Sequence, residues 1–338
     1  MDIYVANRPS LLAILGSSMR KCIFRIISKG PIPSHLAFIL DGNRRFAKKE
    51  NLDAGAGYRA GFSSLLSTLK YCYELGVKYV TIFAFSIDNF RRRPDEVQKV
   101  MDLVLEKTEG ILKEESLIDA YGIGVRFVGN LKLLSEPVRV AAEKAMKATA
   151  KNTRCVLFIC VAYTSTDEIV HSVQESCKDK SNKIDSSKTH KACNGIEGGE
   201  CGKEIDNGIT LGVQEYATNN AVTKGAEVTG KSNGVIVNSF RTENGVISVG
   251  GIEKMPSPPC IKKMDIEKQM YLAAPEPDIL IRTSGENRLS NFLLWQTSTC
   301  LLYSPAALWP EIGLRHLAWA VINFQRTHSY LEEKKKYL

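Results

Sequence analysis

Short apolar runs alternate with longer helix-like segments along most of the 338-residue chain. The runs with the length and apolar content of buried strands are 35–40, 79–85, 125–128, 155–163, part of 277–286 and part of 293–303. Helix-like segments occupy 57–75, 95–120, 136–150, 167–177 and 314–337. The alternation predicts an α/β fold in a single domain, with a central, mainly parallel sheet flanked by helices.

One stretch, residues 178–261, breaks this alternation. It holds 12 of the chain's 25 glycines and only two aromatic residues, Tyr216 and Phe240. Its polar composition cannot bury enough apolar surface to offset the entropy that is lost on ordering. We therefore predict a long disordered insertion at 178–261, which interrupts one globular domain formed by 31–177 and 262–338.

The N-terminal segment, residues 1–30, carries a helix-like stripe of leucine and isoleucine with lysine and arginine between them. Such an amphipathic helix can lie on an anionic membrane, or it can pack on its own domain with its charges solvated. We favour packing on the domain, because one apolar stripe does not identify the surface that it faces.

Charge and cysteine usage exclude several classes of protein. The formal charge of +8 is a mild excess that favours anionic substrates or an anionic membrane surface. It is too weak and too scattered to indicate nucleic-acid binding, and no nucleic-acid-binding motif accompanies it. The nine cysteines form no CxxC pairs, which argues against a disulfide framework and a zinc site and predicts a reducing, cytosol-facing location. No apolar run approaches the roughly 20 residues of a membrane-spanning helix.

Three strand-like runs end in polar residues that suit phosphate chemistry. The first leads into Asp41–Arg45, the second into 85–93, and the third into 282–290. In a parallel sheet such ends meet at one edge, where ligands bind. Gly42 permits a tight turn, and arginine side chains hold phosphate groups through forked hydrogen bonds. A carboxylate among these groups indicates a metal-bound diphosphate site; the alternative is an ordinary Asp-Gly turn with a solvated basic loop.

Other phosphate and metal motifs are missing from the sequence. Residues 55–61 have GxGxxxG spacing and follow no strand, so they do not form a dinucleotide-binding fingerprint. The sequence contains neither a GxxxxGK[ST] phosphate loop nor a DDxxD cluster, and its histidines lack the spacing of metal ligands.

Three motifs, in this order, carry a resemblance to a known family: HLAFILDGNRRFAKK, AFSIDNFRRRPDEV and DILIRTSGENRLSNFLLWQ. They resemble the cis-prenyltransferases of the undecaprenyl and dehydrodolichyl diphosphate synthase type, and the chain is most similar to plant long-chain, rubber-type members. The resemblance covers nearly all of the chain outside 178–261. It implies an Mg²⁺-dependent transferase that condenses isopentenyl diphosphate onto an allylic, farnesyl-type diphosphate to make a long-chain cis-polyprenyl diphosphate, the precursor of dolichol or rubber-type products.

The resemblance also implies roles for individual residues. Asp41 would coordinate Mg²⁺ and, with Asn43, carry catalysis. The allylic diphosphate would lie against Gly42, Arg44 and Arg45. The residues that match the substrate-positioning loop are Phe85, Ser86, Asn89 and Arg92, and those that match the isopentenyl diphosphate site are Arg282, Arg288 and Ser290.

Some positions depart from the family pattern. Ala54 and Tyr58 stand where many members have arginine and histidine, and Leu301 stands where bacterial homodimers have a glutamate metal ligand. These departures keep a second interpretation open, in which the chain is a non-catalytic scaffold subunit of a prenyltransferase complex.

The end of the chain predicts a partner. It lacks the Arg-x-Gly motif with which homodimeric members finish, so the resemblance implies a Nogo-B-receptor-like partner subunit and weak activity without it.

Residues 106–120 resemble the lengthened helix of long-chain members. The expected location is peripheral, on the cytoplasmic face of the endoplasmic reticulum membrane, or cytosolic, and no nucleic-acid partner is expected.

Overall fold

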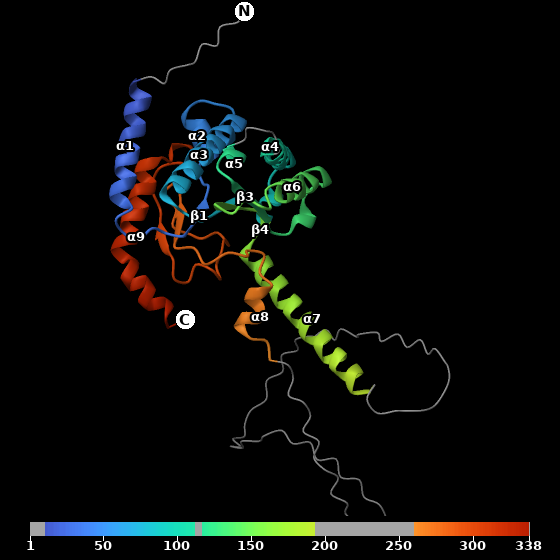
Figure 1. The fold of residues 1–338 in the computed structure, drawn as a ribbon. Helices are drawn as coiled ribbons and strands as arrows, with labels where there is room; N and C mark the ends of the chain where they lie inside the picture. Colours follow the sequence, from blue (N-terminus) through green and yellow to red (C-terminus); the bar gives the residue numbers. More distant parts are fainter. Residues whose placement is uncertain (1–10, 112–116, 193–259, 338) are drawn as a thin grey trace, which may run out of the picture. The chain divides into compact units, whose positions relative to one another are not determined.

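The computed structural model describes residues 11–111, 117–192 and 260–337. The chain divides into two compact units, one formed by residues 1–182 and 261–338 and the other by residues 183–260. The sheet, the helices that pack on it and the candidate site all belong to the first unit, which is described by itself below (Figure 1).

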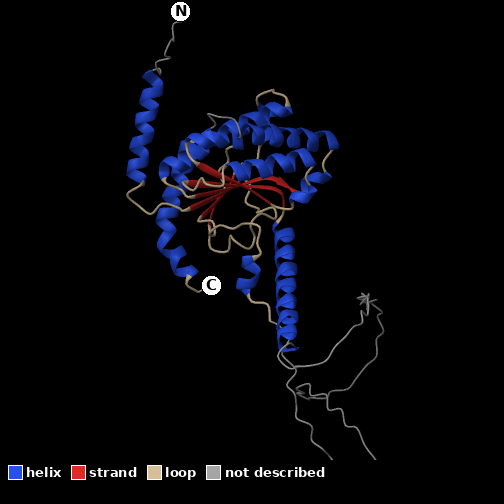
Figure 2. Cartoon of the chain, turned by 45° about the vertical axis from the view of Figure 1, so that its right-hand side comes forward, coloured by secondary structure: helices blue, strands red, loops and turns tan. Residues whose placement is uncertain are grey.

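The predicted parallel sheet is confirmed. Its strands are β1 (His35–Ile39), β2 (Tyr79–Ser86), β3 (Ile123–Val128), β4 (Cys155–Tyr163), β5 (Ile279–Arg282) and β6 (Leu301–Tyr303). They are ordered β3-β4-β2-β1-β5-β6, and every neighbouring pair is parallel. In Figure 2 several helices lie above the red sheet, and loops together with further helices lie below it. Because β2 and β5 flank β1, the three predicted phosphate-binding strand ends are adjacent.

The helices mostly follow the sequence pattern. They are α1 (Leu11–Ile27), α2 (Asn43–Lys49), α3 (Ala54–Leu75), α4 (Pro94–Ile111), α5 (Leu117–Ala120), α6 (Glu136–Ala148), α7 (Ser165–Ala192), α8 (Lys263–Lys268) and α9 (Leu314–Lys335). Short 3₁₀ helices are η1 (Ile87–Arg91), η2 (Leu131–Leu133) and η3 (Trp309–Glu311). The predicted long helix at 95–120 corresponds to α4 and α5, and residues 112–116 lie outside the described residues.

The predicted boundary of the insertion at residue 178 is wrong, because α7 continues to Ala192. No glycine or proline occurs between Ser165 and Ala192, so no helix-breaking residue ends α7 at 178. Beside it, α8 is held by hydrogen bonds from the Ser176 hydroxyl to the Asp265 carbonyl oxygen and from Gln269 to Asp179. The rest of the predicted insertion, 193–259, lies outside the described residues.

Both faces of the sheet are buried, as expected for parallel strands. Alternate side chains of β1 point to opposite faces: Leu36 and Phe38 join the core formed with α3 and α9, whereas Ala37 and Ile39 join a second cluster. That second cluster is closed by the segment before β6, where Phe292 and Leu293 are fully buried. The loop that holds predicted site residues 288–290 is therefore anchored directly on the sheet.

The N-terminal helix α1 packs on its own domain along the part whose side chains are described. Phe24 is buried, Arg20 forms an ion pair with Glu74 of α3 at 2.8 Å, and Gln325 of α9 donates a hydrogen bond to the Ile27 carbonyl. The outward face keeps exposed Met19 and Ile26, with Lys21 and Arg25 between them. Among the described residues, no helix combines the length and apolarity needed to cross a bilayer.

A buried histidine links β1, β2 and the segment before β5. His35 Nδ1 donates to the Pro275 carbonyl oxygen at 2.6 Å, so its Nε2 accepts from the Thr81 hydroxyl at 2.8 Å. Burial lowers the pKa of His35 to about 4, although the Pro275 carbonyl and Asp278 oppose the shift. The imidazole is therefore neutral in the folded protein at physiological pH.

This histidine predicts an acid-sensitive fold. Its folded pKa lies below the unfolded value of 6.5, so the unfolded chain binds the proton more tightly. The free energy of unfolding should be unaffected by His35 above pH 6.5, and should lose up to roughly 3 kcal/mol as the pH falls to about 4. Urea denaturation at several pH values will measure the loss.

Two variants separate this effect from the titration of carboxylates. His35→Gln, whose amide can donate and accept but does not titrate, should lose less stability between pH 6.5 and 4 than the wild type. His171→Gln is the control, because His171 stacks on Tyr271 outside this hydrogen-bonded network. Equal pH profiles for the wild type and His35→Gln would contradict the prediction.

Candidate active site

A cavity of about 790 Å³ opens where β1, β2 and β5 end. Its lining includes every residue that the sequence assigned to catalysis or substrate binding: Asp41, Gly42, Asn43, Arg44, Arg45, Phe85, Ser86, Asn89, Arg92, Arg282, Arg288 and Ser290. These residues come from segments up to about 250 positions apart, and the parallel order of the strands brings them together.

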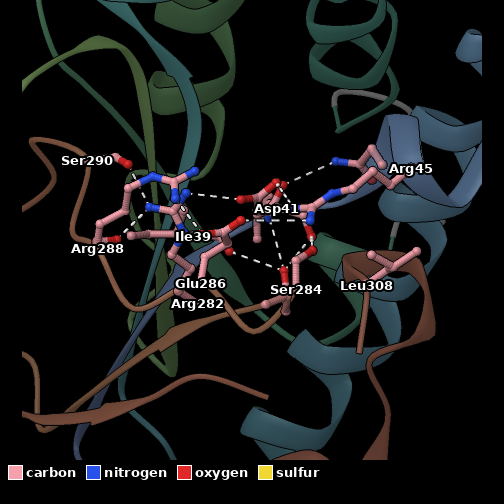
Figure 3. Close-up of polar contacts among 12 residues, drawn as sticks. Ile39, Asp41, Arg45, Arg282, Ser284, Glu286, Arg288, Ser290 and Leu308 are labelled. Carbon is pink, nitrogen blue, oxygen red and sulfur yellow. Dashed lines mark hydrogen bonds and ion pairs between the residues drawn. The ribbon is translucent and has the colours of Figure 1, made fainter. Parts of the chain in front are cut away.

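Asp41 is the central acidic group of the site (Figure 3). Its Oδ1 accepts a hydrogen bond from Arg45 at 3.1 Å, and its Oδ2 accepts one from Arg282 at 3.0 Å. Its backbone is held as well, because the Ser284 hydroxyl and the Trp309 amide both donate to its carbonyl oxygen at 2.9 Å. The carboxylate is thus fixed between two guanidinium groups that come from different elements.

Gly42 is the residue that the turn after β1 requires. Its φ of 111° is in the left-handed region that side chains disfavour. A Cβ atom there would lie 2.5 Å from the Ser284 hydroxyl and 3.0 Å from Leu308. The turn lets α2 begin at Asn43, immediately after Gly42, so Asn43, Arg44 and Arg45 of its first turn line the cavity.

Arg282 organises the opposite side of the cavity. It is almost fully buried at the end of β5, with 6% exposure. One terminal nitrogen donates to both the Ser290 hydroxyl at 2.6 Å and the Arg288 carbonyl oxygen at 2.5 Å, and the other donates to Asp41. Its Nε has no hydrogen-bond partner among the described residues. A buried guanidinium with an unused donor is suited to an anionic ligand.

Glu286 is a site residue that the sequence analysis did not assign. Its carboxylate is hydrogen-bonded to Arg288, and a second oxygen lies 3.8 Å from Arg45 (Figure 3). It therefore links the arginine of α2 to the loop after β5. The motif contained it, but without the register of the sheet nothing indicated that it would approach Arg45.

Asn43 provides an unpaired acceptor at the start of α2. Its Nδ2 donates to the Leu40 carbonyl oxygen at 3.3 Å, whereas its Oδ1 is buried without a partner among the described residues. A Cβ at Gly61 would lie 2.0 Å from this Oδ1, so α3 can approach only because it has glycine there. The glycines at 55–61 thus include one that serves close packing around a functional side chain.

At the outer rim of the cavity, two further arginines form ion pairs with the same glutamate. Glu96 pairs with Arg44 at 3.3 Å and with Arg92 at 3.0 Å. Tyr58, which the sequence analysis noted as a departure, lines the cavity close to them. Burial raises the pKa of the Tyr58 hydroxyl, while Arg92 and Arg44 oppose the shift, so Tyr58 is a neutral hydrogen-bond donor at physiological pH.

The loop after β2 completes the polar mouth. Ser86 ends β2 and caps η1, because its hydroxyl accepts a hydrogen bond from the Asp88 amide at 3.1 Å. Phe85 is buried and packs edge-on against Phe90 with ring centroids 5.0 Å apart. Asn89 belongs to the same short helix, so this loop presents neutral hydrogen-bonding groups to the cavity beside the charged Asp88 and Arg92.

Beyond the polar mouth the cavity is lined by apolar side chains of α3, α4, β2 and their neighbours: Phe62, Leu65, Leu66, Leu69, Ile82, Val100, Leu103, Val104, Ile118, Phe127, Leu157 and Ile159. One exception is Lys107, whose ammonium group lies 5.2 Å from the centre of the Phe62 ring. A charged mouth that continues into an apolar cavity fits an amphiphile with a phosphate head and a hydrocarbon chain.

The donor set suits a cation that shares substrate phosphates. Within the described parts of the chain, no cluster of three or more His, Cys, Asp or Glu side chains is arranged to hold a metal. Mg²⁺ is commonly bound by one or two carboxylates together with substrate phosphates and water. Asp41 supplies one such carboxylate at the cavity, so the residues present fit that mode of binding.

Comparisons with known proteins identify the family to which the chain is similar. Residues 39–331 match the family described as putative undecaprenyl diphosphate synthase. The chain is 52% identical to a rubber cis-polyprenyltransferase of Hevea brasiliensis over 100% of both chains. It is 33% identical to a dehydrodolichyl diphosphate synthase complex subunit of Homo sapiens, over 92% of this chain and 72% of that one.

A solved structure gives the same fold. The lavandulyl diphosphate synthase of Lavandula x intermedia, determined with dimethylallyl diphosphate, has a TM-score of 0.59 and 22% identity. The match covers 87% of this chain and 95% of that one.

Proposed function

The chain belongs to the undecaprenyl diphosphate synthase family, and on that premise we infer that it is a cis-prenyltransferase that makes a long-chain cis-polyprenyl diphosphate. It condenses isopentenyl diphosphate onto an allylic, farnesyl-type diphosphate. The observation that carries this function is a cavity that joins an arginine-rich mouth to an apolar continuation. The mouth suits two diphosphate groups, and the apolar part suits the growing chain.

Each side of the cavity mouth binds one of the two diphosphate groups. Arg282, Arg288 and Ser290 hold the isopentenyl diphosphate, while Gly42, Arg44 and Arg45 hold the allylic diphosphate. A carbon–carbon bond forms as the allylic carbon–oxygen bond breaks, and a proton leaves the isopentenyl unit. The arginines stabilise the charge that develops on the departing diphosphate, and Asn43 lines the cavity beside them with an unpaired acceptor, its Oδ1.

We propose that Asp41 binds Mg²⁺ together with the allylic diphosphate. A divalent cation there supplies additional neutralisation of the departing diphosphate. Arg45 and Arg282 contact the Asp41 carboxylate in the structure, and both guanidinium groups would be available to substrate oxygens if that carboxylate held a cation. Leu301 adds no metal ligand, so the protein contribution rests on Asp41.

We also propose a Nogo-B-receptor-like partner subunit. Relatives from human and mouse are named as subunits of a dehydrodolichyl diphosphate synthase complex. The edge strand β6 has no strand on its outer side among the described residues, and Leu302 on it and Trp319 on α9 are both 52% exposed.

Peripheral association with the endoplasmic reticulum membrane through the outward face of α1 is consistent with its exposed Ile26 and Arg25.

The proposed function is tested by incorporation of labelled isopentenyl diphosphate with farnesyl diphosphate and Mg²⁺, with and without the partner subunit. We expect long-chain product with the partner and little without it. Omission of Mg²⁺, or its chelation, should abolish incorporation. Substantial activity of the chain alone would contradict the heteromer, and exclusively short products would contradict the long-chain assignment.

The alternative function, a non-catalytic scaffold, gives a different result in the same assay. A scaffold would bind the partner and show no incorporation in either arm. The complete set of predicted residues around the cavity favours catalysis, whereas Ala54 and Tyr58 are the departures that favour the scaffold.

A further inference from the structure

We propose that Asn291 is a positioning residue, which holds the loop of Arg288 and Ser290 in its substrate-binding geometry by attaching it to the N-terminal turn of α7. The proposal rests on the proposed function, because it concerns the side of the cavity assigned to isopentenyl diphosphate. Asn291 itself lines the cavity, next to Ser290.

The loop has an unusual backbone that needs external support. Ser290, Asn291 and Leu293 have φ angles of 49°, 59° and 48°, in the left-handed region that residues with side chains rarely adopt. Three such residues within four positions persist only where surrounding contacts fix them.

Asn291 makes three of those contacts with α7. Its Oδ1 accepts hydrogen bonds from the Thr166 amide at 3.0 Å and from the Thr166 hydroxyl at 3.1 Å. Its carbonyl oxygen accepts from the Ser165 amide at 2.8 Å, and the Leu294 amide donates to the Ser165 hydroxyl at 3.0 Å. The first amides of a helix lack partners within the helix, so a residue distant in sequence caps α7 here.

A second anchor lies on the other side of the loop. Phe292 is fully buried, and its ring stacks on Phe83 of β2 with centroids 4.6 Å apart. This apolar anchor holds the loop on the sheet but makes no polar contact with the site. The hydrogen bonds of Asn291 are thus what sets the direction of the adjoining polar residues.

The loop in turn sets the position of the buried arginine. Ser290, which directly precedes Asn291, accepts from Arg282 at 2.6 Å, and the Arg288 carbonyl oxygen accepts from the same nitrogen (Figure 3). Release of Asn291 from α7 would let Ser290 move and would remove the support on one side of Arg282. Within the described residues, no hydrogen bond joins α2, on the allylic side, to Asn291 or Thr166.

Three variants of Asn291 and Thr166 test the proposal. Asn291→Gly keeps the left-handed backbone accessible and removes the acceptor. In the complex with its partner, we expect the KM for isopentenyl diphosphate to rise on the order of tenfold, with less than about a twofold change in the KM for the allylic diphosphate. Asn291→Asp retains the acceptor and should restore most of the affinity. Thr166→Val removes one of the two donors, so its effect should be smaller.

A matched control uses another asparagine in the same backbone conformation. Asn51 has a φ of 54°, is exposed and lines neither the cavity nor its rim. Asn51→Gly should leave both KM values unchanged. Wild-type KM values for Asn291→Gly would overturn the proposal, and so would equal increases in both KM values with a lowered melting temperature, since that result indicates general destabilisation.

Direct binding separates this proposal from the proposed function. Calorimetric titration of the same variants with isopentenyl diphosphate should show the tenfold weakening in Asn291→Gly alone. If the wild-type complex has no turnover but binds, the proposed function fails while this comparison still decides the role of Asn291. Absence of binding to the wild type would overturn both.

Discussion

Asp41→Asn will lower the turnover of the complex by about 10²–10³-fold, the usual cost of removing one group that stabilises transition-state charge. Asparagine has nearly the same shape, but its single oxygen can accept a hydrogen bond from only one of Arg45 and Arg282, which contact the two oxygens of Asp41 at 3.1 and 3.0 Å. The negative charge that a divalent cation requires is absent. Steady-state incorporation of isopentenyl diphosphate at saturating substrates will measure the loss.

Binding should change in the opposite direction when no metal is present. Asp41 repels diphosphate and occupies two arginines, so its neutralisation leaves Arg45 and Arg282 with an uncompensated positive charge. We expect Asp41→Asn to bind inorganic diphosphate without Mg²⁺ at least as tightly as the wild type does. Addition of Mg²⁺ should strengthen binding to the wild type and have little effect on the variant.

The control for Asp41→Asn removes a similar charge nearby. Asp53 caps α3 by accepting a hydrogen bond from the Ala56 amide, and asparagine caps helices equally well. Asp53→Asn should retain wild-type turnover. If Asp41→Asn keeps more than about a third of the wild-type turnover, the role of Asp41 at the reacting groups is wrong, because even one lost donor typically costs far more.

The proximity of Asp41 and Arg282 could be predicted from the sequence, because the prediction depends on two strong sequence signals. A buried parallel strand reads as a short apolar run, and ligands of such sheets lie where the strands end. Polar residues that follow 35–40, 79–85 and 277–282 therefore had to approach one another once β2 and β5 were placed on either side of β1. The arginines among these residues then indicated that the ligand carries phosphate groups.

Other features depend on contacts that no local pattern encodes. Glu286 reaches Arg45 across the cavity, and Asn291 caps a helix more than 120 positions earlier in the chain. Asparagine next to serine is typical of an exposed turn, so only the positions of α7 and the strained loop give Asn291 a role. The extension of α7 past 178 was missed because its polar sequence has no apolar stripe, and composition outweighed helix propensity.

Arg282→Lys will raise the KM for isopentenyl diphosphate by about 10- to 100-fold and leave the KM for the allylic diphosphate nearly unchanged. The guanidinium of Arg282 uses one nitrogen for Ser290 and Arg288, another for Asp41, and keeps Nε free for a ligand. A lysine ammonium is a single point of charge and cannot span these directions, although it preserves the net charge. Loss of a forked, charge-assisted contact of about 1.5–3 kcal/mol corresponds to that range of affinity.

The measurement is initial velocity against isopentenyl diphosphate concentration at saturating farnesyl diphosphate, with Arg154→Lys as the control. Arg154 is exposed and donates to the Tyr73 hydroxyl at 2.9 Å, far along the sheet from the cavity, so the same substitution there should leave both KM values unaltered. An Arg282→Lys variant that loses affinity for the allylic substrate instead would reverse the assignment of the two sides of the mouth. A large fall in kcat with both KM values preserved would place Arg282 at the departing diphosphate, where its contact with Asp41 would then be the one that matters.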